Sequence, residues 1–198
     1  MVSLENRVVS RIDHHLNHEM MEGKTHFSAP VENALQYSPA AMVYALKAFG
    51  IKGRSKLIDQ TNLYLMANTL SKLSASFGKD HFHKTRPAGD PRSFPSAHTA
   101  TAFTAAEFMH QEYKDQSPWL GYAGYPLAAV TGALRLTHNK HWFSDVIGGA
   151  GVGILSTKIS YAAYPWLKEK LFHTKSHATI LPYRTDGTIG LMFQSSLR

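Results

Sequence analysis

Residues 86–99 have the sequence Arg-Pro-Ala-Gly-Asp-Pro-Arg-Ser-Phe-Pro-Ser-Ala-His-Thr, and this stretch decides how the rest of the chain is interpreted. It contains two arginines, three prolines and a histidine, and it leads directly into an apolar segment of helical composition. Ser96 is a favoured N-cap residue, which predicts a helix from Ala97 to about Tyr113. The N–H groups at the start of a helix bind anions well. The stretch therefore predicts half of a phosphate-binding site.

The composition predicts one closely packed domain with a positive charge. The chain has 198 residues, which is enough for a single domain with a sizeable core. Apolar residues make up 43% and charged residues 18%, a balance typical of helices that share little exposed surface. The formal net charge of +7 favours an anionic partner: a phosphoester, an acidic membrane surface or nucleic acid. No cysteine is present, which excludes disulfides and thiolate chemistry.

The hydropathy of the sequence favours a soluble or peripheral protein over one with several membrane spans. The longest segment without a formal charge, Gln116 to Leu134, is interrupted by glycine and proline. The mean hydropathy is −0.24. The first residues lack the apolar core of a signal peptide. We expect a protein of the bacterial periplasm or the periplasmic membrane face, with any signal peptide outside this chain, and a cytoplasmic location is the weaker alternative.

Start and stop signals divide the middle of the chain into about five or six helices. Pro39 and Gly50 bracket the first by the usual preference for proline at the start and glycine after the end. The apolar residues that recur at helical spacing between Leu63 and Phe77 are interpreted as core. The expected helices are Ala40 to Phe49, a helix capped by Ser55 that runs to Phe77 and stops at Gly78, Ala97 to about Tyr113, Ser117 to Leu136 with a kink or a restart at Pro126, and a helix from about Ser144 that bends or ends near Pro165, with a short basic continuation at Lys168-Glu169-Lys170.

The ends of the chain differ from the helical middle. Residues 1–33 are polar without a clear period, and we interpret them as an arm or an irregular cap. Near the other end, Asp186-Gly187 is a strong hairpin-turn signal between two strand-like segments. We therefore expect an all-α, single-domain helical bundle at residues 34–175, followed by a small β-hairpin or extended tail at residues 176–198.

Three blocks of charged and polar residues follow one another in the sequence. They are Lys79, six residues, Arg86-Pro87; then Pro95-Ser96-Ala97-His98; then Arg135, five residues, His141, three residues, Asp145. A phosphomonoester carries about −1.5 to −2 charges, and arginine binds phosphate oxygens through two parallel hydrogen bonds. Lys79, Arg86 and Arg135 are therefore predicted phosphate ligands. Lys84 and Arg92 are interpreted as surface charges.

The third block has a geometric requirement. His141 and Asp145 are four residues apart, about 40° around a helix, so the carboxylate can orient one ring nitrogen and leave the other to attack phosphorus. Arg135 is six residues before His141, roughly 240° away on an unbroken helix, and could not easily serve the same phosphate. The helix must break between them, and residues 138–140 are the expected place.

The order and spacing of the blocks resemble the type 2 phosphatidic acid phosphatase (PAP2) superfamily, which includes bacterial class A acid phosphatases and vanadium-dependent haloperoxidases. The resemblance covers about Lys79 to Asp145. It implies that His141 forms a covalent phosphohistidine, which water hydrolyses without a metal or other cofactor, and that Ser96 binds the phosphate. His98 would protonate the leaving oxygen, and the backbone N–H groups around Ala97 can point at an oxyanion.

Two positions depart from the family pattern. Ala97 stands where glycine is usual, which keeps the backbone donor but narrows the space beside the phosphate. Leu134 replaces the serine that usually precedes Arg135, which removes one polar contact. Both departures bear on substrate choice more than on reaction type.

The sequence thus predicts a phosphoric ester hydrolase that is metal-independent. Phosphomonoesters or pyrophosphates of lipid or isoprenoid type are favoured over small soluble esters, because the chain is basic and its helices are apolar. One alternative is a vanadate-dependent haloperoxidase, which would brominate with vanadate and peroxide. The other is a non-catalytic module for anionic lipid or nucleic acid, with salt-dependent binding and no turnover. A peripheral contact with an anionic membrane is compatible with the charge, whereas no nucleic-acid motif is present.

Overall fold

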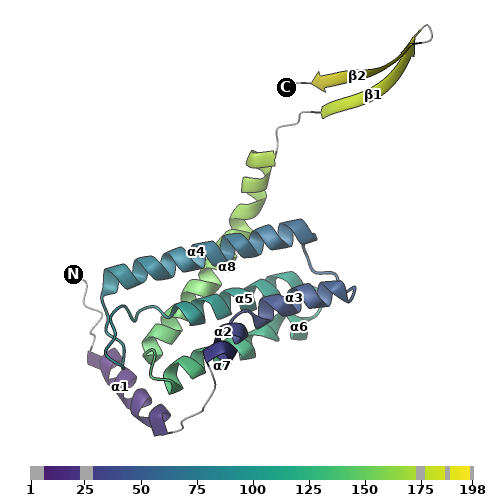
Figure 1. The fold of residues 1–198 in the computed structure, drawn as a ribbon. Helices are drawn as coiled ribbons and strands as arrows, with labels where there is room; N and C mark the ends of the chain where they lie inside the picture. The colour runs from purple at the N-terminus through teal and green to yellow at the C-terminus, as the bar shows by residue number, and fades with distance from the viewer. Residues whose placement is uncertain (1–6, 23–28, 173–176, 186–187, 197–198) are drawn as a thin grey trace. The chain divides into compact units, whose positions relative to one another are not determined.

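The computed structural model describes residues 7–22, 29–172, 177–185 and 188–196. The chain divides into two compact units, Met1–Tyr161 and Ala162–Arg198. The described residues are all-α apart from one pair of strands, as the sequence predicted, and Figure 1 labels each element. These are α1 (Arg7–Glu22), α2 (Ala29–Leu35), α3 (Ser38–Ala48), α4 (Leu57–Phe82), α5 (Ala97–Tyr113), α6 (Pro118–Tyr122), α7 (Gly124–Thr137), α8 (Phe143–Phe172), β1 (His177–Thr185) and β2 (Thr188–Ser196).

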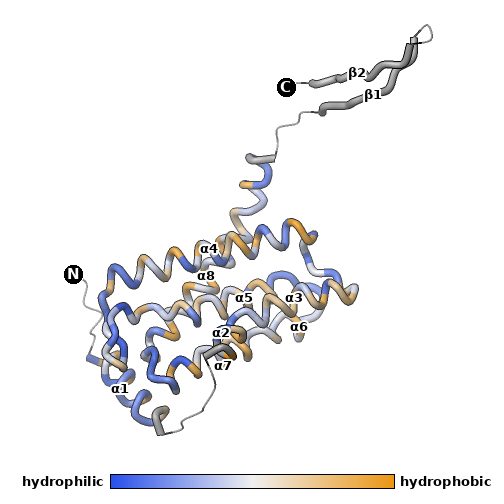
Figure 2. The backbone as a smooth tube through the Cα atoms, viewed as in Figure 1, coloured by the Kyte–Doolittle hydropathy of each residue, from blue (hydrophilic) through white to orange (hydrophobic). Residues whose placement is uncertain are grey.

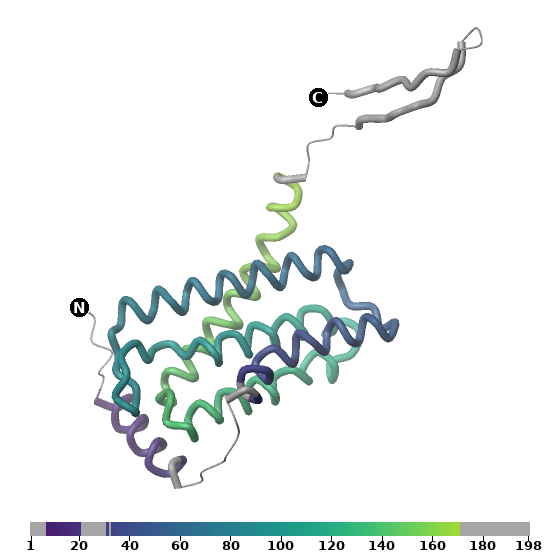
Figure 3. The backbone as a smooth tube through the Cα atoms, viewed as in Figure 1, coloured from purple at the N-terminus to yellow at the C-terminus, as the bar shows by residue number. Residues whose placement is uncertain are grey.

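Helix α5 is the centre of the first unit. It runs between α4 and α7 (Figures 1 and 3) and also contacts α3 and α6. Its alanines and threonines let these neighbours come close. Phe108, Met109 and Tyr113 form a fully buried core with Ala40 and Val43 of α3, and burial of each large side chain contributes roughly 1.5–3 kcal/mol. The helix begins and ends where the sequence predicted.

Helix α8 packs directly against the start of α5 through glycines. A Cβ added at Gly149 would lie 2.5 Å from the carbonyl oxygen of Ser96, and one added at Gly153 would lie 2.4 Å from that of Ala100. Only glycine allows the two backbones to approach so closely. An added Cβ at Gly151, in contrast, meets nothing within 4 Å. The close contact brings the first turns of α5 and α8 together.

The sequence predicted that this helix stops at Gly78, but α4 continues to Phe82. The glycine has a packing role instead: a Cβ added there would lie 2.6 Å from Cδ of Pro95. The helix ends at Phe82, and the next residue, His83, has a left-handed φ of 47°. Gly78 is thus retained at a helix position where it is unfavourable by about 1 kcal/mol, because the loop before α5 crosses it.

The apolar stripe on α4 is only partly core. Leu63 and Ala67 are buried, but Leu73 and Phe77 are 64% and 71% exposed. The prediction that the whole stripe is core is therefore wrong, because periodicity identifies an apolar face without showing what covers it.

By length and composition, α8 is the one described helix that could cross a membrane, and 33% of its most apolar window is buried.

At the two prolines the structure selects among the predicted alternatives: the fourth helix restarts close to Pro126, and the fifth does not end at Pro165. The predicted helix from Ser117 to Leu136 is divided at Ala123 into α6 and α7, so Pro126 lies in the first turn of α7, where proline is tolerated. Helix α8 continues past Pro165. The described residues therefore contain more helices than the five or six expected.

The N-terminal segment is helical where an irregular arm was expected. Figure 2 shows that α1 is largely hydrophilic, and polar contacts hold it in place. Asp13 is only 3% exposed and accepts a hydrogen bond from the backbone N–H of Ser144 at 2.9 Å. The side chain of Asn17 donates to that of Asn139 at 3.0 Å. Apolar residues also recur every four positions along α1, from Val8 to Met20, a stripe that the sequence analysis did not recognise.

The C-terminal strands β1 and β2 are antiparallel, with pairing from His177–Ser196 to Thr185–Thr188. This is the register expected of the predicted hairpin. The turn residues themselves, Asp186 and Gly187, lie outside the described residues.

Candidate active site

The chain breaks between Arg135 and His141, as the geometry of the third block requires. Helix α7 ends at Thr137, Asn139 adopts a left-handed φ of 57°, and α8 begins at Phe143. The backbone N–H of His141 donates back to the carbonyl of Arg135 at 3.2 Å. The turn therefore keeps the two residues together although they belong to different elements, and the prediction of a break is confirmed.

His141 and Asp145 form a buried pair. Nδ1 of His141 lies 3.4 Å from Oδ2 of Asp145, and the residues are 2% and 0% exposed. Burial lowers the pKa of His141, and Arg86 and Arg135 lower it further, while Asp145 opposes both effects. The imidazole is therefore held neutral to a lower pH than usual, and contact through Nδ1 leaves Nε2 as the nitrogen for chemistry.

Three further groups hold the Asp145 carboxylate. Oδ2 accepts from the Ser93 hydroxyl and from the backbone N–H of Trp142, the latter at 2.9 Å, and Oδ1 lies 3.2 Å from Nζ of Lys84. Burial by itself raises the pKa of Asp145, but His141, Ser93, Lys84 and Trp142 together outweigh it, so the pKa is lowered. Asp145 is therefore ionised and fixed in orientation.

Lys84 belongs to this network and is not the surface charge that the sequence suggested. Its Nζ lies 2.8 Å from Asp13 and 2.6 Å from Oγ of Ser144, in addition to its contact with Asp145. Asp13 in turn accepts from both the backbone and the hydroxyl of Ser144. Lys84 thus sits between two buried carboxylates, one from α1 and one from α8.

Ser96 caps α5 and is fully buried. Its hydroxyl accepts from the side chain of Thr99 at 2.9 Å and from the backbone N–H of Thr99 at 3.4 Å. Its own N–H donates to the carbonyl of Asp145 at 3.0 Å. The cap function is confirmed, and both cap bonds use the Ser96 hydroxyl as an acceptor, which is compatible with donation of its own proton to another group. The N–H groups of Ala97 and His98 remain in the first turn of α5, where a helix leaves its donors without intrahelical acceptors.

The structure brings Lys79, Arg86 and Ala97 together in one open cleft of about 400 Å³. Burial lowers the pKa of Lys79, as do the neighbouring cations Arg86 and Arg92. The guanidinium of Arg86 is 3.8 Å from Asp90, and its buried Nε has no hydrogen-bond partner among the described residues. The cleft is therefore rich in positive charge that a bound anion can neutralise.

His98, Arg135 and His141 do not line this cleft. Arg135 is buried at the end of α7, and His141 instead borders a space of about 10 Å³ that α1 covers with Leu16, Asn17 and Met20. Nε2 of the half-buried His98 lies 3.0 Å from Oδ1 of Asn33 in α2. A protonated Nε2 can donate to that oxygen, so the contact fits a histidine that carries a proton there.

The two departures from the motif take different places. Ala97 lines the cleft, where its methyl group occupies space beside the cations. Leu134 is buried, with 6% exposed, so it adds to the core of the first unit.

Sequence reasoning missed Ser93, Asp13 and Asn33. Ser93 lies within residues 86–99, but the carboxylate to which it donates, Asp145, is 52 positions away in the sequence. Asp13 and Asn33 lie in the N-terminal region that was interpreted as an arm or an irregular cap, and their contacts with Ser144 and His98 span more than sixty positions in the sequence. Nothing in the local sequence identifies such partners.

Comparison with known proteins agrees with the motifs. The sequence pattern of the PAP2 superfamily matches residues 60–169. Lipid A 1-phosphatase of Porphyromonas gingivalis is 36% identical over 189 residues, which cover 91% of this chain and 40% of that protein. The chain therefore spans less than half of the length of this curated relative.

Solved structures show the same fold. LpxE of Aquifex aeolicus has a TM-score of 0.57 at 20% identity, over 81% of this chain and 99% of that chain. The first transmembrane PAP2 type phosphatidylglycerolphosphate phosphatase from Bacillus subtilis has a TM-score of 0.58 at 16% identity, over 87% and 92%. The family match includes all three motif blocks and more than half of the chain. The chain belongs to the PAP2 superfamily.

Proposed function

We propose that this protein hydrolyses a phosphate ester of a lipid-like substrate through a phosphohistidine intermediate. The observation that carries the proposal is the buried His141–Asp145 pair, which the Ser96–Asp145 backbone hydrogen bond ties to the start of α5. Membership of the PAP2 superfamily supports the same reaction class. Burial and two nearby arginines keep the imidazole neutral, as a nucleophile must be.

In the first step, Nε2 of His141 attacks phosphorus. A P–N bond forms and the ester P–O bond breaks, while the leaving oxygen takes a proton from Nε2 of His98. In the second step, water gives a proton to His98 and attacks phosphorus. The P–N bond breaks, inorganic phosphate is released, and both histidines return to their first state.

Cations and helix donors hold the charge that this reaction moves. We assign Lys79, Arg86 and Arg135 to the non-bridging phosphate oxygens, together with the N–H groups of Ala97 and His98. Positioning and charge stabilisation are the main contributions a protein makes to phosphoryl transfer. Because its hydroxyl can accept the cap bonds and donate its own proton at the same time, we keep Ser96 as a proposed phosphate-binding residue.

The surface beside the cleft supports a lipid-like substrate. Leu73 and Phe77 follow directly after the cleft residues Lys72 and Ser76 on α4, and both side chains are largely exposed. An acyl or prenyl chain attached to a phosphate in the cleft would find this apolar surface within one helical turn. The relatives named for lipid A and for phosphatidylglycerolphosphate fit the same substrate class.

We further infer that the protein works at a membrane surface on the periplasmic side. The basic charge and the exposed apolar side chains of α4 and α8 favour contact with an anionic bilayer. We keep residues 34–175 as the proposed catalytic domain, with α1 contributing Asp13. Fractionation of cells in low and high salt would test this location, because a peripheral protein is released by salt.

Turnover of an aryl phosphate tests the proposed reaction. We expect His141→Ala to abolish release of the phenol while circular dichroism remains unchanged. His15→Ala is the matched control, because His15 is exposed on α1, and it should retain full activity. Vanadate should inhibit the wild type. Normal turnover by His141→Ala, or bromination in the presence of vanadate and peroxide, would contradict the proposal.

A further inference from the structure

Helix α1 lies over the proposed nucleophile. Leu16, Asn17 and Met20 of this helix close a space of only about 10 Å³ beside His141, which is itself 2% exposed. A space of this size holds one water molecule at most. It shares no lining residue with the cleft that contains the phosphate-binding cations. On the side of α1, His141 is therefore closed to both substrate and bulk water.

Polar contacts hold α1 in this position. Asp13 accepts hydrogen bonds from Ser144 and Lys84, and the side chain of Asn17 donates to that of Asn139 at 3.0 Å. Such bonds exchange for bonds to water at a modest net cost. Among the described residues, none of α1 belongs to the two buried apolar clusters of the first unit. An element held in this way can open locally while the core stays packed.

The apolar stripe of α1 is divided between two environments. Val8, Ile12, Leu16 and Met20 recur every four positions, so they follow one another along one side of the helix. Leu16 and Met20 are half-buried and line the space beside His141. Val8 and Ile12 are 63% and 45% exposed. The stripe therefore has an inner half at the site and an outer half that another apolar surface can reach.

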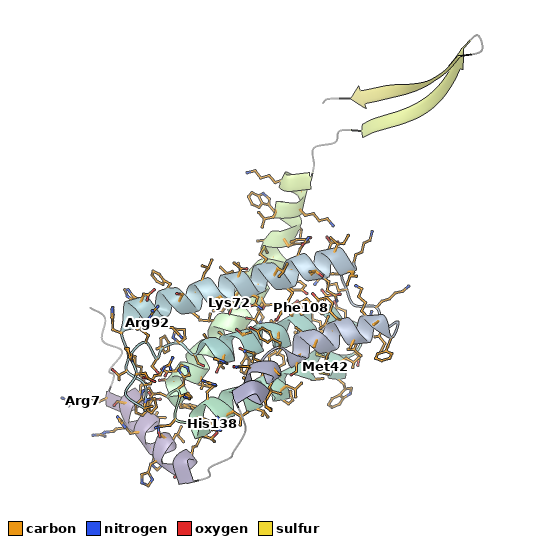
Figure 4. The ribbon with its side chains drawn as sticks, viewed as in Figure 1. Arg7, Met42, Lys72, Arg92, Phe108 and His138 are labelled. Atoms are coloured by element: carbon orange, nitrogen blue, oxygen red, sulfur yellow. The ribbon has the colours of Figure 1, made fainter. Side chains whose placement is uncertain are left out.

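Two arginines border the outer half of the stripe. Arg7 and Arg11 adjoin Val8 and Ile12 in the sequence, and both arginines are exposed. Figure 4 shows Arg7 directed outward from the start of α1. These four residues have the spacing of one helical face, called the outer face below, and positions 7–12 contain no acidic residue. Basic and apolar side chains combined in this way are typical of helices that bind the surface of an anionic bilayer.

We propose that α1 is a lid over His141, and that an anionic bilayer displaces this lid by binding its outer face. The bilayer attracts the inner half of the same stripe as well, so it competes with the site for α1 and shifts the helix toward the open state. Departure of α1 uncovers His141 and leaves Lys84 to Asp145 alone. The inference rests on the proposed function and deepens it, because full hydrolysis is then restricted to the membrane surface where a lipid-like substrate resides.

Turnover of a soluble aryl phosphate in the presence of lipid vesicles tests the lid, because the vesicles then supply a surface but no substrate. Vesicles of phosphatidylglycerol and phosphatidylcholine should raise kcat/KM by about 5-fold or more, the lower end of typical coupling between two sites. Vesicles of phosphatidylcholine alone should have little effect. Added salt should reduce the activation, because it screens the two arginines.

Variants assign the activation to the outer face. Arg11→Gln should weaken binding to the anionic vesicles by about 5-fold, the loss expected for one cation at an anionic surface. Ile12→Ser should reduce both binding and activation. Lys56→Gln, which replaces an exposed lysine just before α4, is the matched control and should change neither. Asn17→Ala leaves the outer face intact but removes the bond to Asn139, so it should raise turnover without vesicles.

Chemical modification of His141 separates a lid from simple concentration of the enzyme at the membrane. Diethyl pyrocarbonate modifies accessible neutral imidazoles, and peptide mass spectrometry locates the product. Anionic vesicles should increase the rate of modification at His141 and should not increase it at His15, which is exposed on α1. This measurement needs no turnover. Failure of the proposed function is therefore distinguishable, because it would abolish hydrolysis while vesicles still changed the modification of His141.

Three results would overturn the proposal. The first is unchanged turnover in the presence of anionic vesicles. The second is activation that persists in both Arg11→Gln and Ile12→Ser, or that occurs without faster modification of His141, since either would assign the effect to another surface or to concentration. The third is equal activation by heparin, which would assign the outer face to soluble polyanions.

Discussion

Replacement of Lys84 by methionine tests the network behind the nucleophile. Lys84 is the cation between Asp13 and Asp145, which are 3% and 0% exposed. Removal of one partner of a buried ion pair destabilises a protein by about 3–5 kcal/mol. The side chain of Lys84 is 22% exposed, which places the expected loss near the lower end, about 3 kcal/mol of unfolding free energy.

The same change should move the pH profile. His141 is faced by Asp145 from α8, by Arg135 from α7 and by Arg86 from the loop before α5. Without Lys84, the charge of Asp145 acts on His141 with less opposition and raises the pKa of the imidazole. The nucleophile must be neutral, so the acid limb of kcat/KM should move to higher pH in Lys84→Met.

Asp13→Asn should move the acid limb in the opposite direction. Lys84 then faces a single carboxylate, Asp145, and opposes its charge more fully, which lowers the pKa of His141. The asparagine oxygen can still accept the hydrogen bond from the backbone N–H of Ser144, so the contact between α1 and α8 is kept.

The assay is kcat/KM for an aryl phosphate across pH, together with urea unfolding of each variant. Lys84→Arg should restore most of the stability and the wild-type acid limb, because the charge is kept. A merely structural role predicts lower stability in both variants with no opposite shifts. Acid limbs that move in the same direction in Lys84→Met and Asp13→Asn would refute the reasoning.

Three further predictions follow from the structure. Because burial lowers the pKa of His141, the wild-type acid limb of kcat/KM should lie below the ordinary histidine value of 6.5, and a limb above this value would contradict a buried nucleophile. Gly78→Ala should lower the free energy of unfolding by about 1–3 kcal/mol, because its Cβ would lie 2.6 Å from Cδ of Pro95. Gly151→Ala should raise the free energy of unfolding by up to about 1 kcal/mol in the same urea titration, because its Cβ meets nothing within 4 Å. Equal effects of the two variants would be inconsistent with the packing. His98→Ala should reduce kcat by about 10²- to 10⁴-fold on an alkyl phosphate but much less on a nitrophenyl phosphate, whose leaving group needs no proton, and equal losses would assign His98 another role.

Much of the candidate site could be predicted because phosphate chemistry restricts the residues that bind and transfer it. The helix capped by Ser96 has the predicted bounds, and the break before His141 followed from the angular positions of Arg135 and His141 on a helix. Both arguments use only local geometry. The structure confirms both the helix bounds and the break.

The rest depended on contacts between distant segments. Lys84 resembled a surface lysine because both of its carboxylate partners lie at least sixty positions away in the sequence. The polar contacts that hold α1, through Asp13 and Asn17, reach residues more than 120 positions away in the sequence. The stripe on α4 was recognised correctly, but its exposure at Leu73 and Phe77 depends on which neighbours are present, and periodicity contains no such information.

The most direct test of the central claim is the chemical identity of the intermediate. Rapid acid-free quenching during turnover of a labelled aryl phosphate, followed by peptide mass spectrometry, should find one phosphoryl group on Nε2 of His141, stable to alkali and labile to acid. The label should be absent from His141→Ala and present in His15→Ala. Phosphate on another residue, or burst kinetics without any labelled histidine, would contradict the account.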